Sequence, residues 1–306
     1  MLMTEAATYD EFSMFEENAR EAGLSYDEPP AVDRCETTLE DGRRLSALRW
    51  GASPPDLVLL HGGGQNAHTW DTVALALGRP LLAIDLPGHG HSGDTSADRP
   101  VGPRSLALDV AVMIERLAPA ASLTVGMSLG GLTATSLAGD RPDLVQRLFL
   151  VDITPGVNHD KASDIISFLA GPETFASFDE ILERTILFNP TRSESSLRRG
   201  VLHNSVQLDD GSWVWRHQRG RPRQLEGDDA VDLDHAGLWD TLGSSGAPLT
   251  LAKGSESPVV DDDDVAELRR RRPDAGIHVV DGAGHSIQGD RPVELAELIE
   301  RAIASS

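Results

Sequence analysis

Short apolar runs recur along this chain, and each one stops at a loop rich in glycine, proline or aspartate. Stretches with helical periodicity separate most of these runs. A parallel sheet covered by helices gives this pattern, because its strands are buried on both faces and its connections cross over through helices. The sequence therefore predicts an α/β fold with a mostly parallel sheet and helices on both faces. The expected strands are 56–60, 80–84, 122–125, 147–151, 248–252 and 277–280, after a hairpin of 35–39 and 45–50 with an Asp-Gly turn.

The alternation of strands and helices is interrupted over residues 156–246. This stretch separates two expected core strands, and it carries mostly helical patterns. We therefore expect a mainly helical lid, inserted after the strand that ends near Val151 and shaping a pocket over the sheet edge. The expected lid helices are 162–169, 178–188 and 195–206, followed by Trp213-Val-Trp215.

The lid divides the expected core into two parts, residues 1–155 and 247–306. The first part opens with an N-terminal helical extension over residues 1–34. Within this extension, Tyr9 to Ala22 has apolar residues at helical spacing and predicts one amphipathic helix.

The pentapeptide Gly126-Met127-Ser128-Leu129-Gly130 follows one of the expected strands and leads into a helix start of small residues. It fits G-x-S-x-G, in which a strand turns sharply into a helix and holds a serine hydroxyl exposed. A side chain at either outer glycine would collide with the neighbouring strand or helix. The pattern predicts Ser128 as a nucleophile, with a structural glycine-rich turn as the alternative.

A nucleophilic serine needs a base to accept its proton, and the base needs an acid that orients it. His285 is the candidate base, because it ends the loop Asp281-Gly-Ala-Gly-His285 directly after the last expected strand. A histidine on such a loop can reach back over the sheet edge to Ser128. The alternative is a loop histidine without a catalytic role.

The chemistry also needs two backbone N–H groups aimed at the developing oxyanion. Leu129, directly after the nucleophile, is expected to supply one. The loop His61-Gly-Gly-Gly64 follows the first core strand and allows close backbone approach. Gly63 is the expected second donor and Gly64 the alternative, unless the loop is merely a flexible turn.

Four motifs together resemble the α/β-hydrolase superfamily: HGGG at 61–64, DLPGHGHSG at 85–93, GMSLGG at 126–131 and DGAGH at 281–285. The resemblance covers residues 35–155 and 246–305. It implies the α/β-hydrolase fold and a catalytic triad in the chain order serine first, histidine last. His89 and His91 are expected to be structural.

The triad acid departs from the commonest pattern of that superfamily. Most relatives carry an aspartate three residues after the glycine that ends the penultimate core strand, and here that position is Ser257. Asp152 instead follows the strand after the elbow helix and precedes Ile-Thr-Pro. Both features resemble the YbfF-type bacterial esterases, which implies Asp152 as the acid. Asp261 is the alternative.

The resemblance implies a serine esterase that transfers an acyl group to water. A carbon–carbon bond hydrolase, a lactonase or a thioesterase shares the same triad, and a non-enzymatic ligand receptor is the alternative from another class. Met127, Trp213 and Trp215 are candidates for contacting substrate, with core packing as the other interpretation.

The composition of the chain argues against some classes of binding partner. The chain has 27 basic and 49 acidic residues, a net charge of −22, which argues against nucleic acid and anionic membranes as partners. It has no apolar run long enough to span a bilayer, an acidic N-terminus unlike a signal peptide, and Cys35 as its single cysteine. We expect a cytoplasmic enzyme acting on a small-molecule ester. Neither a metal nor an organic cofactor is indicated by ligand spacing, and the oligomeric state is undetermined.

Overall fold

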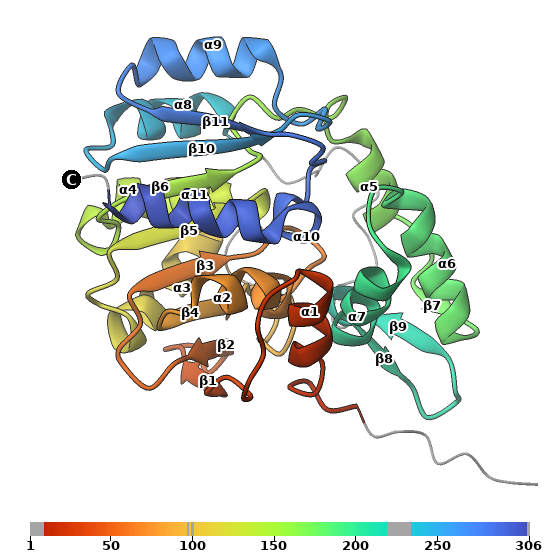
Figure 1. The fold of residues 1–306 in the computed structure, drawn as a ribbon. Helices are drawn as coiled ribbons and strands as arrows, with labels where there is room; N and C mark the ends of the chain where they lie inside the picture. Colours follow the sequence, from red (N-terminus) through yellow and green to blue (C-terminus); the bar gives the residue numbers. More distant parts are fainter. Residues whose placement is uncertain (1–8, 97, 99–100, 219–233, 305–306) are drawn as a thin grey trace, which may run out of the picture.

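The computed structural model describes residues 9–96, 98, 101–218 and 234–304. An eight-stranded sheet runs through the middle of the molecule (Figure 1), in the order β1-β2-β4-β3-β5-β6-β10-β11. The β1–β2 and β2–β4 pairs are antiparallel and the other five pairs are parallel, which confirms the predicted mostly parallel sheet. The strands are β1 Val32–Thr38, β2 Arg44–Trp50, β3 Leu57–Leu60, β4 Leu81–Asp85, β5 Leu123–Met127, β6 Leu148–Val151, β10 Leu249–Gly254 and β11 Gly276–Val280.

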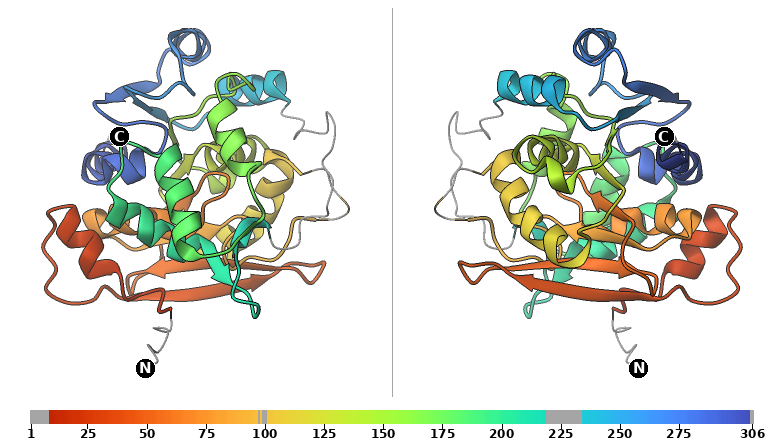
Figure 2. Two further views of the ribbon diagram at one scale, coloured as in Figure 1. Left: turned by 90° about the vertical axis from the view of Figure 1, so that its right-hand side faces the viewer. Right: turned by 90° about the vertical axis from the view of Figure 1, so that its left-hand side faces the viewer.

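The sheet has a separate apolar layer on each face, and β3 shows how the sequence builds both. Val58 and Leu60 join one layer, while Leu57 and Leu59 join the other, and all four are fully buried. Successive side chains of a strand point to opposite faces, so a continuous apolar run serves both layers. Figure 2 shows helices on both sides of the sheet. The first layer is covered by α3 Pro103–Leu117, α4 Leu129–Asp140, α8 His235–Ser244 and α9 Asp262–Arg271, and the second by α1 Phe15–Glu21, α2 Asp71–Leu77, α10 Ile287–Asp290 and α11 Pro292–Ala304.

The N-terminal helix is shorter than the expected Tyr9–Ala22 and begins only at Phe15. Asp10 accounts for the difference. Its carboxylate accepts a hydrogen bond from the backbone N–H of Phe12 at 3.0 Å, and its carbonyl accepts one from the Ser13 hydroxyl at 2.8 Å. Such local bonds offer the backbone a turn in place of a helix.

The segment expected to form a lid lies beside the carboxyl ends of the parallel strands, on the right in Figure 1. Up to residue 218 its described part contains the helices α5, α6 and α7 and also a small antiparallel sheet, in the order β7-β9-β8, that the sequence analysis did not predict. This segment has an apolar cluster of its own. Its elements are α5 Ser163–Leu169, β7 Thr174–Phe175, α6 Phe178–Phe188, α7 Glu194–Asn204, β8 Ser205–Gln207, β9 Trp213–Trp215 and the 3₁₀ turn η3 Arg216–Gln218.

Helix α8 lies within the expected lid range 156–246, yet it packs with the core. Leu238, Trp239 and Leu242 are buried in the same apolar layer as α3 and α4. Their spacing puts them on one helical face, so α8 covers the sheet like the other core helices. Two short 3₁₀ helices, η1 Ala67–Trp70 and η2 Pro142–Leu144, complete the described elements.

None of the helices in the described ranges has the length and apolarity that crossing a bilayer requires. Cytoplasmic location stays a prediction.

Candidate active site

Ser128 lies between β5 and α4, in a backbone conformation that few residues other than glycine adopt. Its φ and ψ are 50° and −121°. A side chain at Gly126 would collide with the backbone of Gly130, and one at Gly130 would collide with the carbonyl of Leu60. The two glycines therefore let the turn pass close to the neighbouring strand, and the strained turn presents the serine hydroxyl at the sheet edge.

Asp152 follows β6 directly, also with positive φ, at 49°, and is fully buried. Its Oδ1 accepts a hydrogen bond from the backbone N–H of Gly254 at 2.8 Å. Its Oδ2 accepts one from His285 Nδ1 at 2.8 Å and another from the Ser257 hydroxyl. Ser257, at the position where the sequence analysis expected the commoner acid, thus donates to the candidate acid Asp152.

His285 lies on the loop after β11, and its side chain is 15% exposed. Gly254 has no room for a side chain, because the carbonyls of Ala283 and Gly284 pass directly over it. This close approach brings the loop against the end of β10 and so toward Asp152. Since Nδ1 donates to the carboxylate, Nε2 carries the lone pair of a neutral ring. Nε2 is buried and accepts no hydrogen bond from the described residues.

The carboxylate of Asp261, the alternative acid, makes its contacts elsewhere. It caps the N-terminus of α9, with Oδ1 accepting from the backbone N–H of Asp264 at 2.9 Å. Its Oδ2 pairs with Lys161 Nζ at 2.8 Å, and this bond lowers the pKa of Asp261 below its usual value. The structure brings Asp152 to His285 and leaves Asp261 at the helix end.

The His61–Gly64 loop is held in place by the buried ring of His61. Its Nδ1 donates to the carbonyl of Gly62 at 2.7 Å, and its Nε2 accepts from the backbone N–H of Leu86 at 2.9 Å. Burial lowers the pKa of His61, so the ring is neutral, as both bonds require. This histidine has no nitrogen left for catalysis and acts as a strut between two loops.

The expected oxyanion donors lie on either side of the Ser128 turn. Gly62 abuts the Ser128 side chain, which brings the loop containing Gly63 and Gly64 beside the turn. Among the described residues, none accepts a hydrogen bond from the backbone N–H of Gly63, Gly64 or Leu129. Leu129 is the first residue of α4, where backbone N–H groups lack intrahelical partners. These N–H groups can therefore donate to a bound oxyanion.

The three residues singled out as substrate contacts pack inside apolar clusters. Met127 is 2% exposed, with its sulfur against Gly62. Trp215 is 5% exposed in the apolar cluster of the lid segment, and Trp213 packs edge-on against Phe178 with ring centroids 5.2 Å apart. Their arrangement follows the core-packing interpretation that the sequence analysis left open.

Two other residues of the lid segment come closest to the glycine loop, and sequence reasoning missed both. Leu169, at the end of α5, and the ring of His217, in η3, both lie against the position of a Gly64 side chain. Neither belongs to a motif. Only the chain fold brings them over the loop, and hydrophobic periodicity alone cannot say which end of α5 faces it.

Residues 57–298 match the alpha/beta hydrolase family, and the chain belongs to that family. It is 45% identical to the esterase Rv0045c of Mycobacterium tuberculosis over 95% of this chain and 94% of that one. A solved structure of that esterase, from work on its inhibition by transition metals, has a TM-score of 0.83 at 43% identity and covers 98% of this chain and 100% of that one.

Two more distant relatives have named substrates. The sn-1-specific diacylglycerol lipase ABHD11 of Xenopus laevis is 28% identical over 82% of this chain and 80% of its own. The pimeloyl-[acyl-carrier protein] methyl ester esterase of Yersinia pestis is 31% identical over 83% of this chain and 96% of its own. Ester hydrolase is the class of enzyme that these comparisons support.

Proposed function

We propose that this chain hydrolyses carboxylic esters of small molecules, with Ser128 as nucleophile, His285 as general base and Asp152 as the acid that orients it. One observation carries the proposal. His285 donates Nδ1–H to buried Asp152 at 2.8 Å, while its Nε2 accepts no hydrogen bond from the described residues. This is the state that a histidine needs in order to take a proton from a serine.

The reaction proceeds in two halves. His285 Nε2 takes the Ser128 proton as the serine oxygen attacks the ester carbonyl, and the resulting imidazolium gives that proton to the departing alcohol. The acyl group then remains on Ser128. His285 next deprotonates a water molecule that attacks the acyl-enzyme, and it returns the proton to Ser128 as the acid leaves.

Negative charge on the carbonyl oxygen is stabilised by the backbone N–H groups of Leu129 and Gly63, with Gly64 as the alternative donor. This assignment is supported by the hydrogen bonding of these groups, because none of the described residues accepts a hydrogen bond from them. Removing one oxyanion donor costs about 3–4 kcal/mol in such sites. Ser257 supports the acid, because its hydroxyl donates to the Asp152 oxygen that faces His285.

The elements from α5 to η3 form the proposed lid over Ser128. The contacts of Leu169 and His217 with the glycine loop support this assignment. The core then consists of the chain up to about residue 155 and the chain from α8 onward. Since the lid covers the oxyanion loop, we expect it to set the size of the acyl group that the enzyme accepts.

Turnover of a p-nitrophenyl ester series from acetate to laurate tests the proposal, with the Ser128→Ala variant as control. We expect serine-dependent turnover with an optimum at one chain length. Labelling by a fluorophosphonate without ester turnover would instead favour a lactone, thioester or carbon–carbon substrate. A chain that neither turns over esters nor labels would contradict the mechanism.

A further inference from the structure

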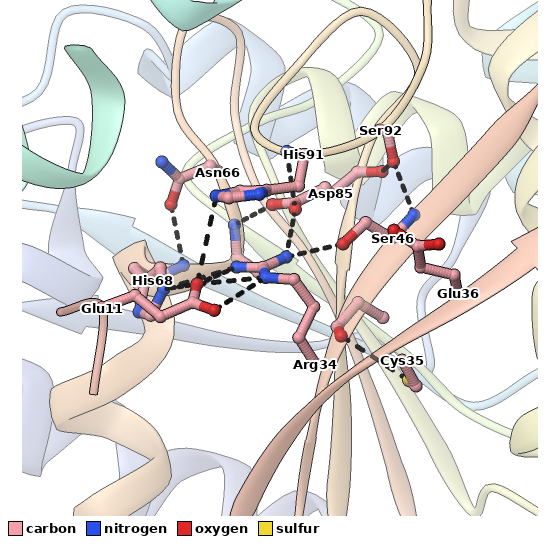
Figure 3. A network of polar contacts seen from close by, with 12 residues as sticks. Glu11, Arg34, Cys35, Glu36, Ser46, Asn66, His68, Asp85, His91 and Ser92 are labelled. Carbon is pink, nitrogen blue, oxygen red and sulfur yellow. Dashed lines mark hydrogen bonds and ion pairs between the residues drawn. The ribbon is translucent and has the colours of Figure 1, made fainter. Parts of the chain in front are cut away.

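A second polar cluster lies where the N-terminal extension, the core and α7 meet. Its centre consists of His68 in η1, Asp71 at the start of α2 and His203 in α7, whose exposed fractions are 7%, 1% and 4%. Figure 3 shows His68 beside Glu11 and Arg34, within a wider network of polar contacts. The ester hydrolysis proposed above makes no use of these residues.

We propose that His68 Nδ1, the Asp71 carboxylate and His203 Nε2 bind one transition-metal ion of the zinc class. The three ligand atoms lie within 4.8 Å of one another. Asp71 Oδ2 is 2.9 Å from His68 Nδ1 and 3.8 Å from His203 Nε2. Ligand atoms on a tetrahedral zinc ion are about 3.3 Å apart, and the two measured distances bracket this value.

Two buried atoms of the cluster make no hydrogen bond with the described residues. They are Asp71 Oδ1 and His203 Nε2, which belong to side chains more than nine-tenths buried. An unmade hydrogen bond at a buried polar atom costs about 1–3 kcal/mol. A metal ion bound between the two side chains would give both atoms a partner.

The other nitrogen of each ring is held in the way that metal-binding histidines require. His68 Nε2 lies 3.0 Å from Glu11 Oε2, and His203 Nδ1 lies 2.7 Å from the Tyr9 hydroxyl. In metal sites such outer oxygens accept the second N–H of each imidazole, fix its orientation and raise its basicity. Both rings therefore turn the correct nitrogen toward Asp71.

The contacts around the cluster balance part of its charge. The nearby guanidinium of Arg34 pairs with Glu11 at 2.6 Å and with Asp85 at 2.7 Å. Asp71 Oδ2 lies 2.9 Å from His68 Nδ1, so a metal ion bound at this nitrogen would also contact the carboxylate.

Two nitrogens and a carboxylate select the kind of metal. Imidazole and carboxylate ligands suit zinc and similar ions, whereas magnesium prefers oxygen ligands and keeps its waters. The His68 and His203 rings stack with centroids 3.8 Å apart, so coordination by both requires one ring to turn out of the stack. The fourth position would be filled by Asp71 Oδ1.

Metal content measures the site directly and independently of ester turnover. The untagged full chain is incubated with zinc or magnesium chloride, desalted and analysed for bound metal, and zinc affinity is measured by competition with a chromophoric chelator. We expect one zinc ion per chain and no retained magnesium. Asp71→Asn and His203→Gln should weaken zinc binding at least about 100-fold.

Tyr9→Phe is the sharpest variant, because it keeps the ring that packs under Arg216 and removes only the hydroxyl that faces His203. We expect it to weaken zinc binding about 10-fold to 100-fold. His159→Gln is the matched control, since the His159 side chain is 80% exposed and distant in sequence from the cluster. It should bind zinc like the unaltered chain.

His285→Ala separates this site from the catalytic histidine. Zinc binding that survives His285→Ala supports the proposal, and binding lost in that variant would overturn it. Retention of no zinc by the unaltered chain would also overturn it. Crystals grown with zinc provide a test that needs no variant, because anomalous scattering at the zinc edge should peak between Asp71 and the two rings. A peak elsewhere alone would contradict the assignment.

Discussion

His285 and His203 each have one ring nitrogen in a hydrogen bond and one without, yet their surroundings differ. The bonded nitrogen is Nδ1 in both rings, and its partner is Asp152 for His285 and the Tyr9 hydroxyl for His203. His285 lies on the glycine-rich loop after β11, and its side chain is 15% exposed. His203 is 4% exposed and stacked on His68 beneath the N-terminal extension. Nε2 of both rings is buried and makes no hydrogen bond with the described residues. Asp71 Oδ2 lies 3.8 Å from His203 Nε2, whereas Asp152 bonds to Nδ1 of His285. The comparison teaches that the position of the carboxylate, rather than a free ring nitrogen alone, separates the proposed metal ligand from the proposed general base.

The largest effect should come from the nucleophile. Ser128→Ala removes the attacking oxygen, and we expect kcat for a p-nitrophenyl ester to fall about 10⁵-fold to 10⁶-fold. Thermal unfolding should show an intact fold. Residual turnover within about 100-fold of the unaltered chain would mean that another residue attacks the ester.

Asp152→Asn should follow, with kcat reduced about 10⁴-fold, because an amide can hold His285 in the wrong tautomer. Asp261→Asn is the matched control. Asparagine keeps the helix cap and loses the ion pair with Lys161, so we expect the free energy of unfolding to fall by no more than about 1 kcal/mol while kcat is unchanged. If the two variants exchanged these effects, the acid would be Asp261.

In the cluster around His68 and Asp71, replacing a carboxylate by an amide should lower the stability of the fold and leave kcat unchanged. Glu11 pairs with Arg34 at 2.6 Å and with His68 at 3.0 Å. Glu11→Gln removes one of the two carboxylates that pair with Arg34, and Asp85 remains. We expect the free energy of unfolding to fall by about 1.5–3 kcal/mol. Denaturant unfolding measures this. A large loss of kcat at a temperature where the variant is folded would show that the two clusters are coupled.

Ser257→Ala should give the smallest effect. It removes one of the three hydrogen bonds to the Asp152 carboxylate. A hydrogen bond to a charged group contributes about 1.5–3 kcal/mol, and part of this loss should appear as a roughly 10-fold lower kcat. Ser257→Thr keeps a hydroxyl at this position. A kcat in that variant equal to that of the unaltered chain would confirm that the hydroxyl supports turnover.

Local patterns were enough to predict the sheet. Ser128 directly follows a strand and His285 lies on the loop after another, so the parallel sheet places both at the same edge. The order of the candidate triad was implied by the resemblance. Asp152 required the resemblance, since nothing local distinguishes an aspartate after β6 from a capping residue. The Asp152–His285 contact joins segments far apart in the sequence.

The lid segment and the second cluster could not be predicted in the same way. The β7-β9-β8 sheet has strands of only two or three residues, too short for an alternation to be recognised. Tyr9, Glu11 and His203 come together only because the N-terminal extension folds back onto α7. Single-sequence spacing contains no record of such a contact, so it indicates no metal site there.

The positive φ angles of Ser128 and Asp152 have a consequence for protein engineering. They are the only residues other than glycine with positive φ among the described residues, and both belong to the proposed triad. Such conformations cost about 1–3 kcal/mol each, more than the roughly 0.5–1 kcal/mol of entropy that a glycine loses on folding. Directed evolution that selects for heat resistance alone would therefore favour glycine at both positions. The most stable variants would then be inactive, so each round of selection must also screen for turnover.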